Sequence, residues 1–180
     1  MVEYRCDMEG RKPALNMLVI GKGVVEWVAA QTSEFNCFGT DVGIGWAKRK
    51  APHIYPNYGY EIMKDGMPSD FKLVAGVAYA NWNGPNVECH IASDGSRKWL
   101  TRKYLSTIFD YPFNQLRVDR ITVCVGEGNT DSTRFVKHLG FILEAKLKGA
   151  HPTGDLLIYR MDRQDCRFIR KGFTCEKLAA

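Results

Sequence analysis

The fold of this chain is decided by residues 129–144, which read NTDSTRFVKHLGFILE. Small and apolar side chains recur at positions 132, 135, 136 and 139, a helical spacing that predicts one helix over Thr130–Leu139. Gly140 follows at once, where a left-handed C-cap belongs. A strand is then predicted over Phe141–Ala150. The stretch therefore specifies a helix, its end and the return into a sheet.

Outward from this stretch, hydrophobic periodicity and turn residues predict the rest of the second half of the chain. The further elements are a strand over Lys72–Ala80, a turn over Asn81–Pro85, a strand over Asn86–Ala92, a helix over Arg97–Asp110 and strands over Arg120–Val125 and Asp155–Met161. Helical crossovers between strands indicate a mixed sheet with helices on its faces. We expect an α+β (α/β) fold with a mixed, mostly antiparallel central sheet flanked by helices.

The first half of the chain carries weaker patterns. Val24–Ala30 predicts a short helix and Asp41–Ala47 predicts a strand. Residues 48–70 are broken by prolines and glycines and form the longest stretch without a regular pattern. The expected organisation is a single domain over 1–176 with a polar lead-in over 1–16, a core over about 24–161, a loop insertion over 48–70, a C-terminal helix or tail over 162–176 and a vector-derived end over 177–180.

Composition is that of a globular domain. The chain has 180 residues, a formal net charge of +5 and six cysteines, none of them in a C-x-x-C pair. Cysteines spaced in this way argue against a zinc ribbon, and the four histidines are too dispersed to predict a metal site. No apolar run approaches the roughly 18 residues of a membrane span, and the first residues do not predict a secretory signal. We expect a cytoplasmic protein with no metal and no membrane partner.

The motifs N-x-x-S at Asn129–Ser132 and L-G-F-x-x-E at Leu139–Glu144, in this order of elements, resemble those of the Gcn5-related N-acetyltransferases. The resemblance covers Lys72–Met161 and is strongest to the ribosomal-protein-acetyltransferase branch. Phe109–Leu116 and Tyr159–Phe168 also resemble phage-encoded acetyltransferase-like proteins. The resemblance implies the fold of that superfamily, acetyl-CoA as cofactor and an amine as acetyl acceptor. The alternative for both motifs is ordinary helix capping.

Two positions depart from the family pattern. The family holds pyrophosphate on a loop that reads Q/R-x-x-G-x-G/A, whereas Asp94–Thr101 offers Gly95 as its one glycine. Four cations follow it, at positions 97, 98, 102 and 103, where a helix N-terminus disfavours positive charge unless an anion binds there. The alternative is a solvated basic face. Val136 stands where many relatives carry the tyrosine that protonates the thiolate, which leaves that proton to water or to another tyrosine, or leaves an acyl-CoA-binding scaffold without chemistry.

The resemblance and the residue types together predict an acetyl-CoA site and a proton acceptor. The predicted cofactor-binding residues are Ile91, Ala92, Ser93, Gly95, Ser96, Arg97, Lys98, Trp99, Asn129, Ser132 and Phe135. Family likeness implies that backbone N–H groups near Ile91–Ser93 donate to the thioester oxygen. Glu88 and His90 lie two residues apart, hence on one face of a strand, and either can take the proton of an acceptor ammonium. The alternative is that they line a solvated strand face.

The acceptor site is predicted in the loop insertion, whose aromatic residues give it enough apolar surface to pack as a lid. Lys48, Arg49, Tyr55 and Tyr58 are its candidate substrate-binding residues. The alternative is a lid that only covers core. A second function also stays open, because basic clusters at 48–50, 97–103 and 167–171 beside aromatics suit nucleic acid. That protein would be a base modifier or a catalytically silent binder of DNA or RNA. Monomer and homodimer are both left open.

Overall fold

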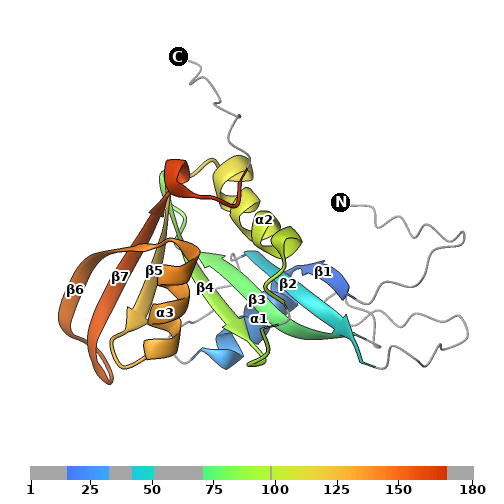
Figure 1. Cartoon of the computed structure of the whole chain (residues 1–180), viewed down its shortest axis with the longest axis horizontal. Helices are drawn as coiled ribbons and strands as arrows, with labels where there is room; N and C mark the ends of the chain where they lie inside the picture. Colours follow the sequence, from blue (N-terminus) through green and yellow to red (C-terminus); the bar gives the residue numbers. More distant parts are fainter. Residues whose placement is uncertain (1–15, 33–41, 51–70, 98, 170–180) are drawn as a thin grey trace, which may run out of the picture.

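The computed structural model describes residues 16–32, 42–50, 71–97 and 99–169 (Figure 1). The strands of this part of the chain are β1 (Asn16–Ile20), β2 (Val42–Arg49), β3 (Phe71–Ala80), β4 (Asn86–Ser93), β5 (Arg120–Gly126), β6 (Ile142–His151) and β7 (Gly154–Asp162). The helices are α1 (Lys22–Gln31), α2 (Arg102–Asp110) and α3 (Thr130–Leu139), with a π-helix η1 (Tyr111–Gln115) and a 3-10 helix η2 (Arg163–Asp165).

All seven strands belong to one sheet in the order β1-β2-β3-β4-β5-β7-β6. Neighbouring strands are antiparallel except β4 and β5, which are parallel. Helix α1 packs on one face of the sheet, and α2 and α3 pack on the other (Figure 1). The predicted mixed, mostly antiparallel sheet flanked by helices is confirmed.

Helix α1 lies close to the sheet because glycines of β2 and β3 face it. A Cβ atom at Gly43 would lie 2.8 Å from Val24 Cβ and 2.8 Å from the backbone nitrogen of Val25. Cβ atoms at Gly45 and Gly76 would each lie 3.0 Å from a methyl carbon of Val24. The helix therefore occupies the space that side chains would fill, and the two valines are completely buried.

The opposite face carries the larger core, under α2 and α3. Tyr104 of α2 is fully buried, and its hydroxyl donates to the Ile44 carbonyl at 2.7 Å. Its ring centre lies 5.6 Å from that of Trp46 and 5.8 Å from that of Trp99. Phe135 of α3 continues this line of rings, 5.7 Å from Trp99. The aromatic contacts hold both helices against the sheet beside β4.

Helix α2 begins five residues later than predicted, at Arg102 rather than Arg97. The Thr101 hydroxyl caps it by accepting from the Tyr104 backbone N–H at 3.2 Å. Trp99 is buried but lies ahead of the helix, so apolar periodicity extends upstream of the true start. The predicted start is therefore wrong. The N-cap at Thr101 sets the first helical residue at Arg102, whereas apolar periodicity alone would extend the helix upstream.

Helix α3 runs over Thr130–Leu139 as predicted, and the left-handed cap at Gly140 is confirmed by its φ of 107°. By contrast, the sequence does not predict β1, which has five residues and pairs with β2 at the edge of the sheet that the described residues form. Val19 of this strand is 3% exposed, so the core reaches further than the expected start near residue 24. Short edge strands carry too few alternating positions to be recognised by periodicity.

The end of the described chain is a strand and a short turn. β7 continues to Asp162, and η2 follows within the segment predicted as a C-terminal helix or tail. The Arg163 guanidinium ties this turn to η1 by donating to the Phe113 carbonyl and, at 2.6 Å, to Asn114 Oδ1. Cys166 is fully buried, so the core includes this turn as well. Among the helices of the described residues, none has the length and apolar character to cross a membrane.

Candidate active site

The candidate site depends on the point where β4 and β5 part. Their parallel register covers three residue pairs and ends at Glu88 opposite Thr122. Beyond this pair, residues 89–93 of β4 and 123–126 of β5 are not paired with each other. A cavity of about 290 Å³ lies at this splay. The backbone of β4 is therefore open on its β5 side just where the sequence predicts a thioester oxygen to be bound.

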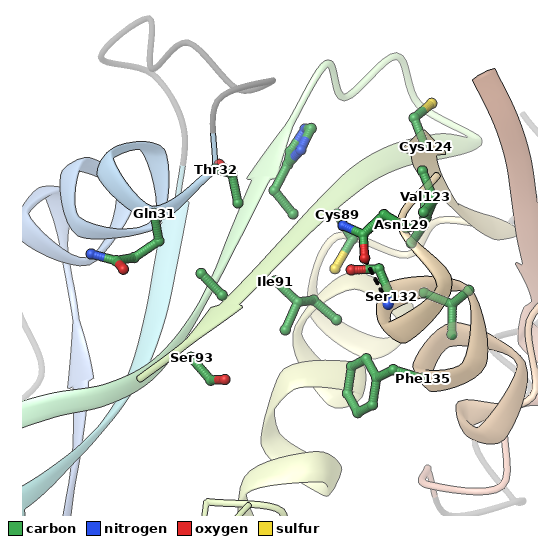
Figure 2. Close-up of a pocket in the computed structure, with 14 residues that line it drawn as sticks. Gln31, Thr32, Cys89, Ile91, Ser93, Val123, Cys124, Asn129, Ser132 and Phe135 are labelled. Atoms are coloured by element: carbon green, nitrogen blue, oxygen red, sulfur yellow. Dashed lines mark hydrogen bonds between the residues drawn. The ribbon is translucent and has the colours of Figure 1, made fainter. Parts of the chain in front are cut away.

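Residues from both faces of the sheet line this cavity. Gln31 and Thr32 reach it from the end of α1, and Ser132 and Phe135 reach it from α3 on the opposite face (Figure 2). The cavity also brings together the predicted residues His90, Ile91, Ala92, Ser93 and Asn129. Elements from both faces of the sheet therefore contribute to this one cavity.

Alternation along β4 decides which face each side chain meets. Cys89 belongs to the core under α2 and α3, so Glu88 and His90 point toward the α1 face. Glu88 Oε2 lies 3.8 Å from His90 Nε2 and accepts from Asn81 Nδ2 at 2.8 Å. The His90 ring and then the Asn81 amide hold the pKa of Glu88 below its ordinary value, against the opposing effect of partial burial. The two predicted proton acceptors are therefore in contact.

His90 and Glu88 differ in their access to the cavity. His90 is among the residues that line it, whereas Glu88 is not and lies beside the imidazole. Both side chains are partly buried, with 18% of His90 and 31% of Glu88 exposed. Starting from the cavity, the His90 imidazole is followed by the Glu88 carboxylate, which in turn is bound by the Asn81 amide. A base whose ring is held by a carboxylate is a recurrent arrangement in acid–base catalysis.

The start of α3 supplies the polar groups on the other side of the splay. Asn129 caps the helix, its Oδ1 accepting from the Ser132 backbone N–H at 3.0 Å (Figure 2). Phe135 and Val136 continue the same helix face with apolar surface. Val136 is 3% exposed and occupies the place where the family carries its tyrosine, so no hydroxyl enters the cavity from that position.

The predicted phosphate loop uses some of its own donors. The Gly95 N–H donates to Ser93 Oγ at 3.3 Å and the Ser96 N–H donates to Asp94 Oδ1 at 3.0 Å. Burial opposes ionisation of Asp94, but the Ser96 hydrogen bonds and the neighbouring lysine charges outweigh it and keep the pKa of Asp94 below its ordinary value. These two N–H groups therefore have partners within the loop, and their role in holding phosphate stays a prediction.

Donors that suit an anion lie further along, at the true start of α2. Helix geometry leaves the first backbone N–H groups, those of Arg102 and Lys103, without intrahelical partners. Both side chains are exposed. Of the other loop residues, Arg97 is exposed, Trp99 is buried behind Phe135, and Lys98 lies outside the described residues. The capping pattern at Thr101 is the sequence signal that would have located this helix start.

Among the predicted acceptor residues, Lys48 is the one whose side chain the structure describes, and it lies away from the splay. Lys48 pairs with Lys72 on β3, whereas His90 pairs with Ala78 on the same strand. Six residues of extended chain separate those partners, roughly 20 Å along the strand. Lys48 instead lies near Asp94, whose pKa its charge helps to lower. Arg49 ends β2, with its side chain undescribed, and Tyr55 and Tyr58 lie outside the described residues.

Basic residues of the described chain do not favour the nucleic-acid alternative. The Arg167 guanidinium donates to the His138 carbonyl at 2.7 Å and lies 5.0 Å from the centre of the Phe168 ring. Lys48 and Lys72 act on Asp94 within the molecule. No group of three histidine, cysteine or acidic side chains among the described residues could hold a metal ion. Among the described residues, the predicted site residues come together at the splay.

Several cavity residues were not predicted. Gln31, Thr32 and Cys124 line it, as does Cys89, whose burial raises the pKa of its thiol to about 12. A thiol with so high a pKa is a weak nucleophile at neutral pH. Local sequence contains no signal for these positions, because they come from α1, β4 and β5 and meet only in the folded chain. The sequence reads Cys89 as a small apolar residue of a strand, and its burial agrees.

Comparison with known proteins is informative at the level of structure. Neither a family model nor a curated protein sequence matches this chain. A structure of mutant forms of the spermidine/spermine N-acetyltransferase SpeG from Vibrio cholerae matches with a TM-score of 0.57 and 13% identity, over 83% of this chain and 95% of that one. The spermidine N-acetyltransferase from Vibrio cholerae in complex with CoA and spermine matches with a TM-score of 0.57 and 12% identity, over 84% and 97%.

These matches cover almost the whole length of the acetyltransferase chains. At such low identity they establish the fold, and the likeness to the ribosomal-protein branch and to phage proteins stays a prediction from sequence. The element order, the one parallel strand pair and the splay beside it all agree with the resemblance drawn from residues 129–144. The chain has the fold of the Gcn5-related N-acetyltransferases.

Proposed function

We propose that this protein is an acetyl-CoA-dependent N-acetyltransferase that transfers an acetyl group to a primary amine of a protein or a small molecule. The observation that carries the proposal is the cavity at the β4–β5 splay, which is lined from both faces of the sheet. A transfer between two substrates needs their reacting atoms in one place, and a cavity lined from both faces lets each arrive from its own side.

The residues of the α3 side fit the acyl end of acetyl-CoA. The cavity there offers apolar surface from Phe135 and Val136 and polar groups from Asn129 and Ser132. At the start of α2, the backbone N–H groups and the side chains of Arg102 and Lys103 suit a diphosphate. When bound, acetyl-CoA supplies the acetyl group as an activated thioester. The chain holds and orients it between the two helices.

Proton transfer falls to the α1 side. An acceptor amine must lose its ammonium proton before it can act as a nucleophile. We assign that proton to the imidazole of His90, a residue that lines the cavity, and the stabilisation of the resulting imidazolium to the Glu88 carboxylate beside it. Open backbone N–H groups of β4 after Glu88 are the candidate donors to the thioester oxygen.

Two acceptor classes follow from the similarities. The matched structures are of spermidine and spermine acetyltransferases, so a polyamine is one class to test. The sequence motifs resemble the ribosomal-protein branch, so the amino terminus of a peptide is the other. Both are primary amines, and both demand the same proton acceptor at the splay.

Calorimetry with acetyl-CoA at near-millimolar concentration tests the cofactor. We expect binding that Ser132→Ala and Lys103→Glu weaken severalfold. Ser106→Ala and Lys137→Glu are matched controls, because both residues are exposed and do not line the cavity. Absence of heat and of any rise in melting temperature with acetyl-CoA would refute the proposal. Acetyl transfer to spermine or to a short peptide then identifies the acceptor class.

A further inference from the structure

We propose that Asn81 is a positioning residue of the candidate active site, whose side-chain amide holds the Glu88 carboxylate against the His90 ring. This inference rests on the proposed function, because it concerns the proton acceptor assigned there. Asn81 belongs to the turn between β3 and β4, outside the cavity and outside every motif of the sequence analysis.

The hydrogen bond is directed at one particular oxygen. Asn81 Nδ2 donates to Glu88 Oε2 at 2.8 Å, and that same oxygen is the one 3.8 Å from His90 Nε2. A carboxylate held at one oxygen cannot rotate that oxygen away from the imidazole. Asn81 therefore fixes the atom through which Glu88 acts on His90.

The backbone of Asn81 is held in a conformation that few residues adopt. Its φ is 53°, and Arg117 is the other non-glycine residue with positive φ in the described part of the chain. Asparagine tolerates this region better than other side chains, at a cost of about 1 kcal/mol or more. The rest of the turn is fixed separately, by the bond from the Asn86 N–H to Asn83 Oδ1. The turn thus has its own support, and the Asn81 amide is left to Glu88.

The groups that act on the Glu88 carboxylate come from few elements. Among the described residues they are His90 on the same strand and Asn81 from the turn. Across the sheet, Glu88 pairs with Ala80 on β3 and with Thr122 on β5, and neither is charged. The nearby Arg120 guanidinium is engaged by Glu144. Loss of the Asn81 amide therefore removes one of the two side chains that favour the ionised carboxylate.

Two substitutions separate the amide from the backbone conformation. Asn81→Gly accepts positive φ and lacks the amide, whereas Asn81→Asp also accepts it and places a second carboxylate against Glu88. If Asn81 served only the turn, both variants would behave like the parent protein. If it positions Glu88, the pKa of Glu88 rises in the glycine variant and rises further in the aspartate variant, by charge repulsion.

The first measurement needs no substrate. Carbon-13 NMR of protein labelled at the glutamate carboxyl carbon follows the titration of Glu88, whose signal is identified by its loss in Glu88→Gln. Asn83→Ala is the matched control, since it removes another amide of the same turn that does not touch Glu88. We expect the pKa of Glu88 to rise in both Asn81 variants and to stay at the parent value in the control. Unchanged titration in the two Asn81 variants would overturn the proposal.

The second measurement is the steady-state kinetics of acetyl transfer from acetyl-CoA to spermine. With Glu88 no longer held against His90, we expect kcat of Asn81→Gly to fall roughly tenfold, the scale of one hydrogen bond to a charged group, with KM for acetyl-CoA unchanged. A parental kcat in Asn81→Gly, or a loss confined to KM, would overturn the assignment. A shifted Glu88 titration in a protein that acetylates no amine would instead refute the proposed function and leave the Asn81–Glu88 link demonstrated.

Discussion

At the scale of single residues, His90 and Glu88 show what a strand pattern can and cannot predict. Their spacing of two places them on one face, and the structure puts them in contact. Which of the two meets the cavity depends on where β4 leaves β5, and no local pattern records that point. Asn81 escapes prediction for a similar reason, because its partner lies across a hairpin turn that reads only as turn chemistry.

His90→Ala should lower kcat by a factor of about 10² to 10⁴, the usual contribution of a positioned acid–base group. KM for acetyl-CoA should stay near the parent value, because the imidazole lies on the α1 face and the cofactor is assigned to the α3 face. Steady-state kinetics with spermine or a peptide amine measures both. His138→Ala is the control, since His138 is exposed on α3. A His90→Ala enzyme with parental kcat would remove His90 from the mechanism.

At the scale of elements, apolar periodicity predicts the bounds of α3 correctly and the start of α2 wrongly. For α3, periodicity, capping asparagine and terminal glycine all agree, and both boundaries are confirmed. For α2, apolar periodicity runs upstream into Trp99, which is buried by the aromatic rings of Tyr104 and Phe135 rather than by helical packing. A buried loop residue at helical spacing looks like a helix residue in the sequence. Here the cap at Thr101 is the signal that separates the loop from the helix.

Thr101→Ala removes that cap and should destabilise the protein by about 1 kcal/mol. It should also weaken acetyl-CoA binding, because the cap holds the N–H groups assigned to the diphosphate. Urea unfolding and calorimetry measure the two effects. Thr107→Ala on the same helix is the control, since the Thr107 hydroxyl donates to the Lys103 carbonyl and caps nothing. Equal stability of the two variants would contradict the capping role.

The contact between α1 and the sheet gives a second prediction at this scale. Gly43→Ala should destabilise the protein by about 1–3 kcal/mol, because the new methyl would lie 2.8 Å from backbone and side-chain atoms of α1. Gly128→Ala is the matched control, since the nearest atom to a Cβ there is 3.8 Å away. Thermal unfolding compares them. If both variants melt together with the parent protein, the close approach of α1 does not limit its packing.

At the scale of the whole molecule, the sequence predicts the order of the elements along the chain well. It predicts poorly how far neighbouring strands pair within the sheet. Alternation and capping are local, so they find strands and helices one at a time. The parallel pairing of β4 with β5, a seam of three residue pairs, joins segments that lie more than thirty residues apart in the chain, as Asn86 opposite Arg120 shows. The cavity exists only because that seam is short. Its lining residues Gln31, Thr32 and Cys124 could not be named before the seam was seen.

The short seam has a consequence for the order of events during turnover. Since the cavity is lined from both faces, neither substrate has to depart before the other enters. Initial rates should therefore give intersecting rather than parallel lines in double-reciprocal plots, the signature of a ternary complex. Desulfo-CoA should compete with acetyl-CoA and not with the amine, because each substrate would enter the same cavity from its own face of the sheet. Parallel lines would instead indicate a covalent acetyl-enzyme intermediate between two half-reactions, with CoA leaving before the amine binds.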